Sequence, residues 1–230
     1  MLVISDIHLY MYRRTKLLLP CNVAQDTSID NVHNTVTLQY MDDCIKNTLK
    51  TNKNPIIVFL GDVIDNAYLK EPEIQEFKDV LKQYPHNRKI IILGNHDTSS
   101  NIPENKLKYS ALRYLANVVN LEFITDYSIE IKDTKILIYW SFTQRKDMYE
   151  KLSLVFSKVK KITQDTTISE IILLTHNNIY LTDTLFNQRM YPLPTIVKML
   201  DEAYIDKKIK FTVINGHIHK THYEKCVNMY

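Results

Sequence analysis

Glycine is scarce in this chain, which has three glycines among 230 residues. Globular proteins use about 7% glycine, several times more. The three are Gly61, Gly94 and Gly216, and each follows a short apolar run and precedes polar residues. A chain so poor in glycine is expected to keep it where the backbone turns with a positive φ or where a Cβ atom would not fit.

Cysteine, long apolar runs and a dominant charge are scarce too. Three cysteines without a Cys-x-x-Cys spacing favour free thiols in a reducing compartment. No apolar run approaches the roughly 18 residues of a membrane span, and we see no signal peptide, so we expect a cytoplasmic location. The composition, 45% hydrophobic and 24% charged, excludes disordered, collagen-like and coiled-coil proteins. A net charge of +3 is too small to indicate nucleic-acid binding by itself.

Short apolar runs alternate with helical patterns along the chain. Runs rich in Ile and Val are typical of buried strands, and apolar residues three and four positions apart are typical of helices. The expected strands cover residues 2–5, 56–60, 90–93, 136–140, 171–174 and 211–214. The expected helices cover residues 35–50, 72–84, 107–117, 148–162 and 195–204. This alternation predicts an α/β fold with mostly parallel central strands, in a single domain over residues 1–230.

Three segments depart from the alternation. Residues 121–132 followed by 135–140 favour a hairpin that turns at Asp133 and Thr134. Residues 10–34 and 181–194 are long loops, and long loops inside a compact domain are often functional.

Polar side chains follow five of the expected strands. The carboxyl ends of parallel strands share one edge of a sheet, and ligands bind there. The residues expected at this edge are Asp6, His8, Asp62, Asp65, Asn95, His96, Asp97, His176, His217 and His219. Carboxylate, amide and imidazole donors suit Mn²⁺, Fe²⁺ or Zn²⁺. Asp6 and His8 would lie on one side of an extended segment, because strand side chains alternate. The number of donors suits two ions about 3.5–4 Å apart, bridged by a carboxylate.

These motifs, in their order along the chain, resemble those of the calcineurin-like metallophosphoesterases. They are Asp-x-His at 6–8, Gly-Asp-x-x-Asp at 61–65, Gly-Asn-His-Asp at 94–97, His176, and Gly-His-x-His at 216–219. The resemblance implies a four-layer α/β/β/α sandwich with two facing mixed β-sheets. It also implies two divalent metal ions and a metal-activated water that attacks phosphorus in line.

The resemblance assigns roles to individual residues. The implied ligands of the first ion are Asp6, His8, Asp62 and His219, and those of the second are Asp62, Asn95, His176 and His217. His96 would stabilise the transition state or protonate the leaving oxygen. Asp97 and Asp65 would orient a histidine or a loop near the reaction, although Asp65 is equally well placed to be a helix N-cap.

The flanking residues distinguish among branches of this superfamily. Ser5 and Leu9 beside the first motif and Asp97 in the third separate the chain from the protein Ser/Thr phosphatases. They look like the nuclease subunit of the SbcCD type, found in bacteria and phages. Such enzymes pair with an SbcC-type ATPase and cut DNA ends with Mn²⁺. The resemblance therefore implies DNA as substrate and, if a phage encodes the chain, the host cytoplasm as location.

Basic and aromatic residues occur in both long loops. Tyr10, Arg13 and Arg14 follow the first motif, and this mixture suits a nucleic-acid strand through stacking and phosphate pairing. Arg189 in the second loop could reach a substrate phosphate. The alternative for all four is an ordinary solvated loop.

Three functions remain open at this point. The first is a Mn²⁺-dependent DNA nuclease, with Fe²⁺, Zn²⁺ or Mg²⁺ as alternative metals. The second is a phosphodiesterase or phosphatase that acts on nucleotides or another small phosphate ester, which the lack of a recognisable capping domain favours. The third is a scaffold that has lost catalysis, against which the filled ligand positions argue. Both a monomer and a homodimer are compatible with the sequence.

Overall fold

The structure, a computed structural model, describes residues 1–10, 29–143, 145–180, 191–202 and 208–217. The chain divides into two compact units, unit 1 over Met1–Thr125 and unit 2 over Asp126–Tyr230. Each unit has a four-stranded sheet and its own hydrophobic core. The single domain over residues 1–230 stays a prediction. None of the helices in the described ranges has both the length and the apolar character that crossing a membrane requires.

The sheet of unit 1 is parallel throughout and has the strand order β1-β2-β3-β4. Its strands are β1 (Leu2–Ile4), β2 (Ile57–Leu60), β3 (Lys89–Ile92) and β4 (Leu121–Ile124). β2 and β3 are buried at every position. Continuous apolar sequence is typical of such central parallel strands, because neither of their faces meets water.

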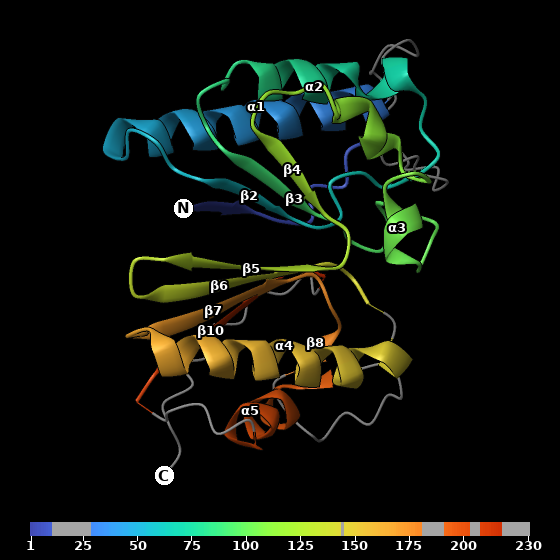
Figure 1. Cartoon of the computed structure of the whole chain (residues 1–230). Coiled ribbons are helices and arrows are strands. Elements are labelled where there is room, and N and C mark those ends of the chain that lie inside the picture. The colour runs from blue at the N-terminus through green and yellow to red at the C-terminus, as the bar shows by residue number, and fades with distance from the viewer. Residues whose placement is uncertain (11–28, 144, 181–190, 203–207, 218–230) are drawn as a thin grey trace. The chain divides into compact units, whose positions relative to one another are not determined.

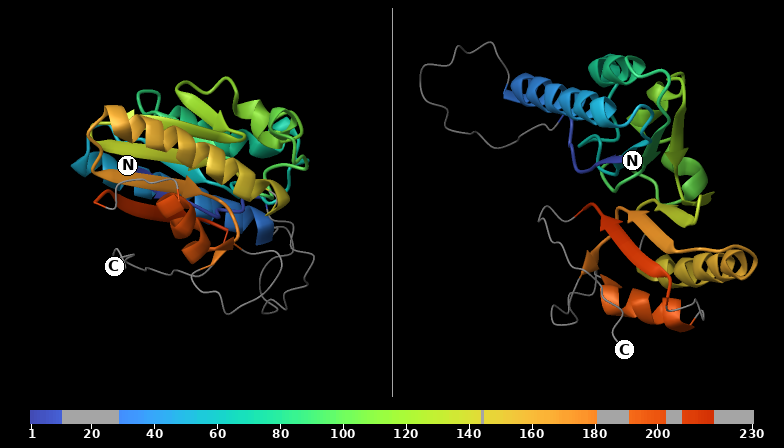
Figure 2. Two further views of the ribbon diagram at one scale, coloured as in Figure 1. Left: turned by 60° about the horizontal axis from the view of Figure 1, so that its bottom comes forward. Right: turned by 90° about the vertical axis from the view of Figure 1, so that its left-hand side faces the viewer.

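Two helices cover one face of this sheet (Figure 1), and the right view of Figure 2 shows the same helices from the side. They are α1 (Ile29–Thr51) and α2 (Gln75–Lys82), the latter preceded by the 3-10 turn η1 (Glu71–Ile74). Met41 and Ile45 of α1 join Phe59 of β2 and Phe77 of α2 in the core. The rings of Phe59 and Phe77 meet edge to face at 5.6 Å between centroids, a favourable aromatic geometry.

The helix expected over residues 107–117 is divided into shorter elements. Helix α3 (Pro103–Lys106) ends before it, and the 3-10 helix η2 (Ala111–Leu115) occupies its centre. The Oγ atom of Ser110 accepts a hydrogen bond from the amide of Leu112 at 3.1 Å. Ser110 thus caps a new helical segment, and this local bond interrupts an apolar spacing that alone favours one continuous helix.

The sheet of unit 2 is mixed and has the strand order β10-β7-β6-β5. Its strands are β5 (Tyr127–Lys132), β6 (Lys135–Trp140), β7 (Glu170–Thr175) and β10 (Lys210–Asn215). Only β5 runs antiparallel to its neighbour. Helices α4 (Arg145–Asp165) and α5 (Leu193–Glu202) cover one face (Figure 1). The short pair β8 (Ile179–Tyr180) and β9 (Tyr191–Pro192) completes the described part.

The segment 121–132 does not form one strand. Its first part is β4 and pairs with β3 in unit 1, and its second part is β5 and pairs with β6 in unit 2. The hairpin of β5 and β6 turns at Asp133 as expected, with φ of 55° there. The expectation of an α/β fold on two sheets with helices is confirmed, although the sheet of unit 1 is parallel where we expected a mixed one.

Charged side chains join the amino ends of three adjacent strands in unit 2. Glu170 accepts hydrogen bonds from Lys135 at 2.7 Å, from Lys210 at 2.6 Å and from the Thr212 hydroxyl at 2.9 Å. Lys135 and Lys210, followed by the hydroxyl of Thr212, lower the pKa of Glu170 to about 2. This cluster ties β6, β7 and β10 at the ends opposite His176 and His217.

Candidate metal centre

The loops that follow β1 and β2 lie side by side in unit 1. The amide of Asp6 donates to the carbonyl of Gly61 at 3.2 Å, and the amide of His8 donates to the carbonyl of Asp62 at 2.9 Å. These bonds continue the pairing of the two strands beyond their ends in an irregular form. The first two motifs, far apart in the sequence, are therefore held next to each other by the backbone.

Several expected ligands have a left-handed backbone. The angle φ is 53° at Asp6, 44° at His8, 48° at Asp62 and 73° at His217. These are four of the seven non-glycine residues with positive φ in the described ranges. Such a conformation costs about 1–2 kcal/mol per residue and clusters at functional sites, where the surroundings hold it in place.

The prediction that the Asp6-x-His8 segment is extended is therefore wrong. Strand β1 ends at Ile4, and both ligand positions lie in the irregular segment that follows it. Three of these side chains still converge, because one donor atom each of Asp6, His8 and Asp62 lies within 4.8 Å of the others. Nε2 of His8 is 3.8 Å from Oδ2 of Asp62. Both residues are buried, and Asp6 is partly exposed, so an imidazole and one carboxylate meet away from bulk water beside a second carboxylate.

Gly94 allows the loop after β3 to approach Asp62. A Cβ atom at this position would lie 2.3 Å from Oδ1 of Asp62 and 2.4 Å from its backbone nitrogen. Such distances are below any van der Waals contact, so only glycine fits here. Oδ1 of Asp62 also accepts a hydrogen bond from the amide of His96 at 2.9 Å. The second and third motifs are thus joined through the Asp62 carboxylate.

Asp97 is a second connection between the same loops. Its side chain is buried. Oδ1 accepts from the amide of Ile64 at 3.1 Å, and Oδ2 accepts from the amide of Gly94 at 2.8 Å. Hydrogen bonds to an ionised carboxylate are the strong kind, so Asp97 positions the loop that carries Asn95 and His96. It acts on the site through the backbone.

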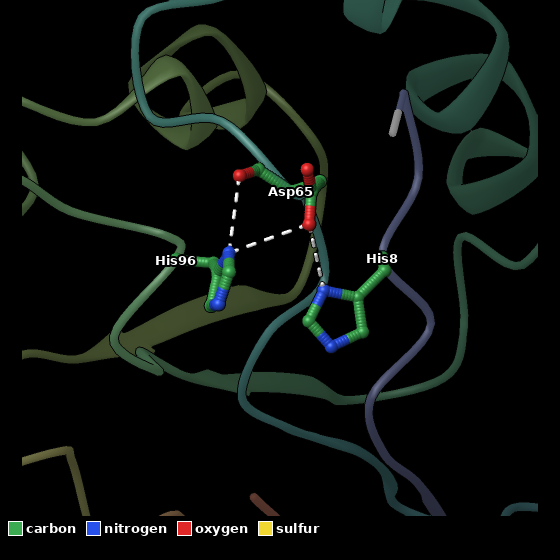
Figure 3. A group of neighbouring side chains, drawn as sticks. All are labelled: His8, Asp65 and His96. Atoms are coloured by element: carbon green, nitrogen blue, oxygen red, sulfur yellow. Dashed lines mark hydrogen bonds and ion pairs between the residues drawn. The ribbon is translucent and has the colours of Figure 1, made fainter. Parts of the chain in front are cut away.

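Asp65 contacts two imidazoles at once (Figure 3). Its Oδ1 atom lies 3.2 Å from Nδ1 of His8 and 3.3 Å from Nδ1 of His96, and Nδ1 of His96 is also 3.2 Å from the Asp65 carbonyl. A carboxylate in this place holds a proton on each Nδ1 and leaves each Nε2 for an ion or a substrate. Since η1 starts at Glu71, the N-cap interpretation of Asp65 is wrong.

The amide oxygen of Asn95 provides a test of whether these residues fit a metal ion. Oδ1 of Asn95 is buried and has no hydrogen-bond partner among the described residues. An unsatisfied buried acceptor costs about 1–3 kcal/mol and is rare. A divalent cation is a partner that accepts amide oxygens together with carboxylates and imidazoles. The donors of unit 1 therefore fit a divalent metal ion.

Unit 2 has a pair of histidines of its own. His176 follows β7 and is fully buried, and His217 follows β10. Nδ1 of His217 lies 3.3 Å from Nε2 of His176, and the rings meet edge to face at 5.1 Å. Two nitrogens bound to one ion at tetrahedral angles would lie roughly 3.3 Å apart, given ion–nitrogen distances of about 2.0–2.1 Å. The pair therefore has the spacing of two ligands of one ion.

Asn177 supports this histidine pair, and our sequence reasoning missed it. Its side chain is buried. Nδ2 donates to the hydroxyl of Thr175 at 2.6 Å, Oδ1 accepts from the amide of Thr143 at 2.9 Å, and its own amide donates to Oδ1 of Asn215 at 3.0 Å. The segments that end β6, β7 and β10 thus meet at one asparagine. The sequence offers no signal for this role beyond a polar residue next to His176.

Of the predicted substrate-binding residues, only Tyr10 lies in the part of the chain that the structure describes. The Tyr10 side chain is only 9% exposed and belongs to the core of unit 1. Burial raises its pKa to about 12. The expectation that Tyr10 stacks on a nucleic-acid strand is therefore wrong for this conformation. Arg13, Arg14, Arg189 and the predicted ligand His219 lie outside the described residues.

Comparison with known proteins identifies a family that matches nearly the whole chain. The calcineurin-like phosphoesterase family matches residues 1–221, whereas no curated protein matches. Among solved structures, the chain is similar to a protein of unknown function, AQ665 from Aquifex aeolicus. That match has 16% identity and a TM-score of 0.36, and covers 93% of this chain and 88% of the other.

A second similar structure is the nuclease MPE of Pseudomonas putida. It has 12% identity and a TM-score of 0.34, and the match covers 78% of this chain and 62% of that one. The match thus spans less than two thirds of the Pseudomonas protein. At these identities and scores, neither structure bears on the function of this chain.

Proposed function

The chain belongs to the calcineurin-like phosphoesterase family, and on this basis we propose that it is a nuclease that hydrolyses phosphodiester bonds of DNA with Mn²⁺. Family membership implies a metal-dependent phosphoester hydrolase. The observations that carry the proposal are the convergence of Asp6, His8 and Asp62 and the unsatisfied amide oxygen of Asn95 in the loop that is hydrogen-bonded to Asp62. The sequence resemblance to SbcCD-type nucleases supports the choice of DNA and makes an SbcC-type ATPase the partner to seek.

Two groups of residues would hold the metal ions. In unit 1 these are Asp6, His8 and Asp62, and in unit 2 His176 and His217 offer a further pair of donors. Bound divalent ions supply Lewis-acid activation of a water and neutralise charge on the phosphate. Because the carboxylate of Asp65 holds Nδ1 of His8, Nε2 is the nitrogen that His8 would offer to an ion.

His96 has the position of a proton donor. Its side chain is 41% exposed and so is accessible to a substrate, and its Nδ1 atom is held by Asp65. The leaving oxygen of a phosphodiester needs a proton as the bond to phosphorus breaks, and a positioned imidazole supplies it from Nε2. Asp62 fixes the backbone of His96, so the proton donor and a candidate metal ligand move together.

The test compares two substrates with the same enzyme preparation. End-labelled single- and double-stranded DNA and bis(4-nitrophenyl) phosphate are each incubated with Mn²⁺ and with EDTA. We expect Mn²⁺-dependent cleavage of both. His96→Asn should lower turnover by about 10²–10⁴-fold while the metal content stays that of the wild type. His86→Asn is the matched control, because His86 is exposed and away from the motifs.

The contrary outcomes are distinct. Cleavage of the small ester without cleavage of DNA would replace the nuclease by a phosphodiesterase of small esters. Full activity of His96→Asn would remove the proton donor from the proposal. Asp62→Ala should lose metal together with activity, and an Asp62→Ala protein with wild-type metal content would contradict the ligand assignment.

A further inference from the structure

Hydrogen bonds join three segments of unit 1 beside Asp65 and His96. The carbonyl of Ala67, in the loop after β2, accepts from the amide of Ala111 at the start of η2 at 2.8 Å. The hydroxyl of Thr98, just after the third motif, donates to the carbonyl of Lys106 at the end of α3 at 2.9 Å. The loops that carry Asp65 and His96 are therefore each hydrogen-bonded to the segment from α3 to η2.

Tyr68 is displayed on the first of these loops. Its side chain is 75% exposed, although both of its neighbours, Ala67 and Leu69, are buried. Its amide donates to Oδ1 of Asn66 at 2.9 Å, which closes a local turn. The backbone around the ring is thus anchored on both sides, and Tyr68 lies three residues after Asp65. An aromatic side chain this exposed buries little surface in unit 1.

Aromatic rings and cations alternate on the second segment. Tyr109 is 46% exposed, and Nζ of Lys108 lies 5.4 Å from its ring centroid. The guanidinium of Arg113 lies 4.3 Å from the ring of Tyr114 and donates to its hydroxyl at 2.6 Å. Tyr109 is two residues before Ala111, the residue bonded to the Tyr68 loop. We name Tyr68, Lys108, Tyr109 and Arg113 the aromatic rim.

We propose that the aromatic rim binds single-stranded nucleic acid next to the reactive group His96. Bases of any sequence stack on tyrosine rings, and Lys108 and Arg113 provide the positive charge that a phosphate backbone needs. A small phosphate ester without a base would leave these rings unused. This inference rests on the proposed nuclease function and narrows its substrate to single strands or frayed duplex ends.

Binding and catalysis are measured separately to test this proposal. Fluorescence anisotropy with a labelled twelve-nucleotide oligothymidylate, in Ca²⁺ in place of Mn²⁺, gives Kd. Tyr68→Ala and Tyr109→Ala should each raise Kd by about five-fold to a hundred-fold, the range of one lost base–aromatic stack. Tyr68→Phe and Tyr68→Trp should bind like the wild type. The midpoint of thermal unfolding should be unchanged in all four variants, which separates a loss of binding from a loss of folding.

Tyr40→Ala is the matched control. Tyr40 is 71% exposed and Tyr68 is 75% exposed, but Tyr40 lies on α1, so its replacement should not change Kd. If the wild type binds and cleaves DNA while Tyr68→Ala and Tyr109→Ala bind as tightly, the aromatic rim is overturned and the nuclease stands. If the wild type hydrolyses the small ester but neither binds nor cleaves DNA, both the nuclease function and the role of the aromatic rim are contradicted.

Discussion

In unit 1, side-chain carboxylates make the hydrogen bonds that connect the loops at the strand ends. In unit 2, side-chain amides and hydroxyls connect the corresponding loops. In unit 1, Asp97 and Asp62 accept backbone hydrogen bonds from the neighbouring loop. In unit 2, Asn177, Thr143 and Asn215 connect the ends of three strands. Carboxylates make the stronger hydrogen bonds but bring negative charge to the site. Unit 1, which has the carboxylate ligands, therefore also connects its loops through carboxylates. Unit 2, which has the histidine pair, connects its loops through neutral groups.

The largest effect is expected where the loops of unit 1 touch most closely. Gly94→Ala places a Cβ atom within 2.4 Å of the Asp62 backbone nitrogen, and backbone cannot move aside as a flexible side chain can. We expect a loss of about 4 kcal/mol or more in the free energy of unfolding, measured by urea denaturation. Unchanged stability would show that the two loops can separate, and the close-packed description of unit 1 would be wrong.

Asp97→Ala removes the carboxylate that connects the loops after β2 and β3. It leaves the amides of Gly94 and Ile64 without their acceptor in a buried place, which should cost about 3 kcal/mol. Metal affinity should fall as well, because the loop with Asn95 and His96 loses its anchor. Urea denaturation and isothermal titration with Mn²⁺ measure the two effects. Asp79→Ala, at an exposed position on α2, is the control, and an equal loss there would remove the special role of Asp97.

The corresponding change in unit 2 is Asn177→Ala. It breaks the connection among the segments ending β6, β7 and β10 and should cost about 2 kcal/mol. Because Asn177 follows His176 directly, metal affinity should also fall by about 10–100-fold. Asn178→Ala is the neighbouring control. A variant with lower stability but wild-type metal affinity would mean that Asn177 holds the sheet without positioning the histidine.

The smallest effect is expected at the far end of the same strands. Glu170→Gln replaces a charged acceptor whose pKa is lowered to about 2 and should cost about 1 kcal/mol at pH 7. A lowered carboxyl pKa stabilises the fold above the ordinary value of 4.5, and this contribution is lost as pH falls towards about 2. Stability of the wild type should therefore decrease more steeply than that of Glu170→Gln over this range. Activity at pH 7 should not change, and a loss of activity would connect the two ends of the sheet.

The strands and the places of the ligands could be predicted because both depend on local pattern. Apolar runs of Ile and Val form β2, β3 and β7, and polar residues directly after them lie at the strand ends. The assignment of 121–132 failed because β4 and β5 are separated by only Thr125 and Asp126. Periodicity shows that a segment is a strand, but it does not show which sheet the strand joins.

Other features depend on contacts that no local pattern contains. The left-handed backbone at Asp6 and His8 follows from bonds to the loop after β2. The burial of Tyr10 and the exposure of Tyr68 follow from how helices and loops pack. Both are tyrosines next to a metal motif, and the sequence favoured the one that the fold places in the core.

The left-handed ligand positions create a trade-off between stability and activity. Glycine is the residue that relaxes such a backbone, and this chain has only three glycines. At positions 6 and 8 it carries an aspartate and a histidine in the strained conformation. Random mutation followed by selection for heat resistance alone should therefore enrich glycine at these positions and yield well-folded proteins that no longer bind metal.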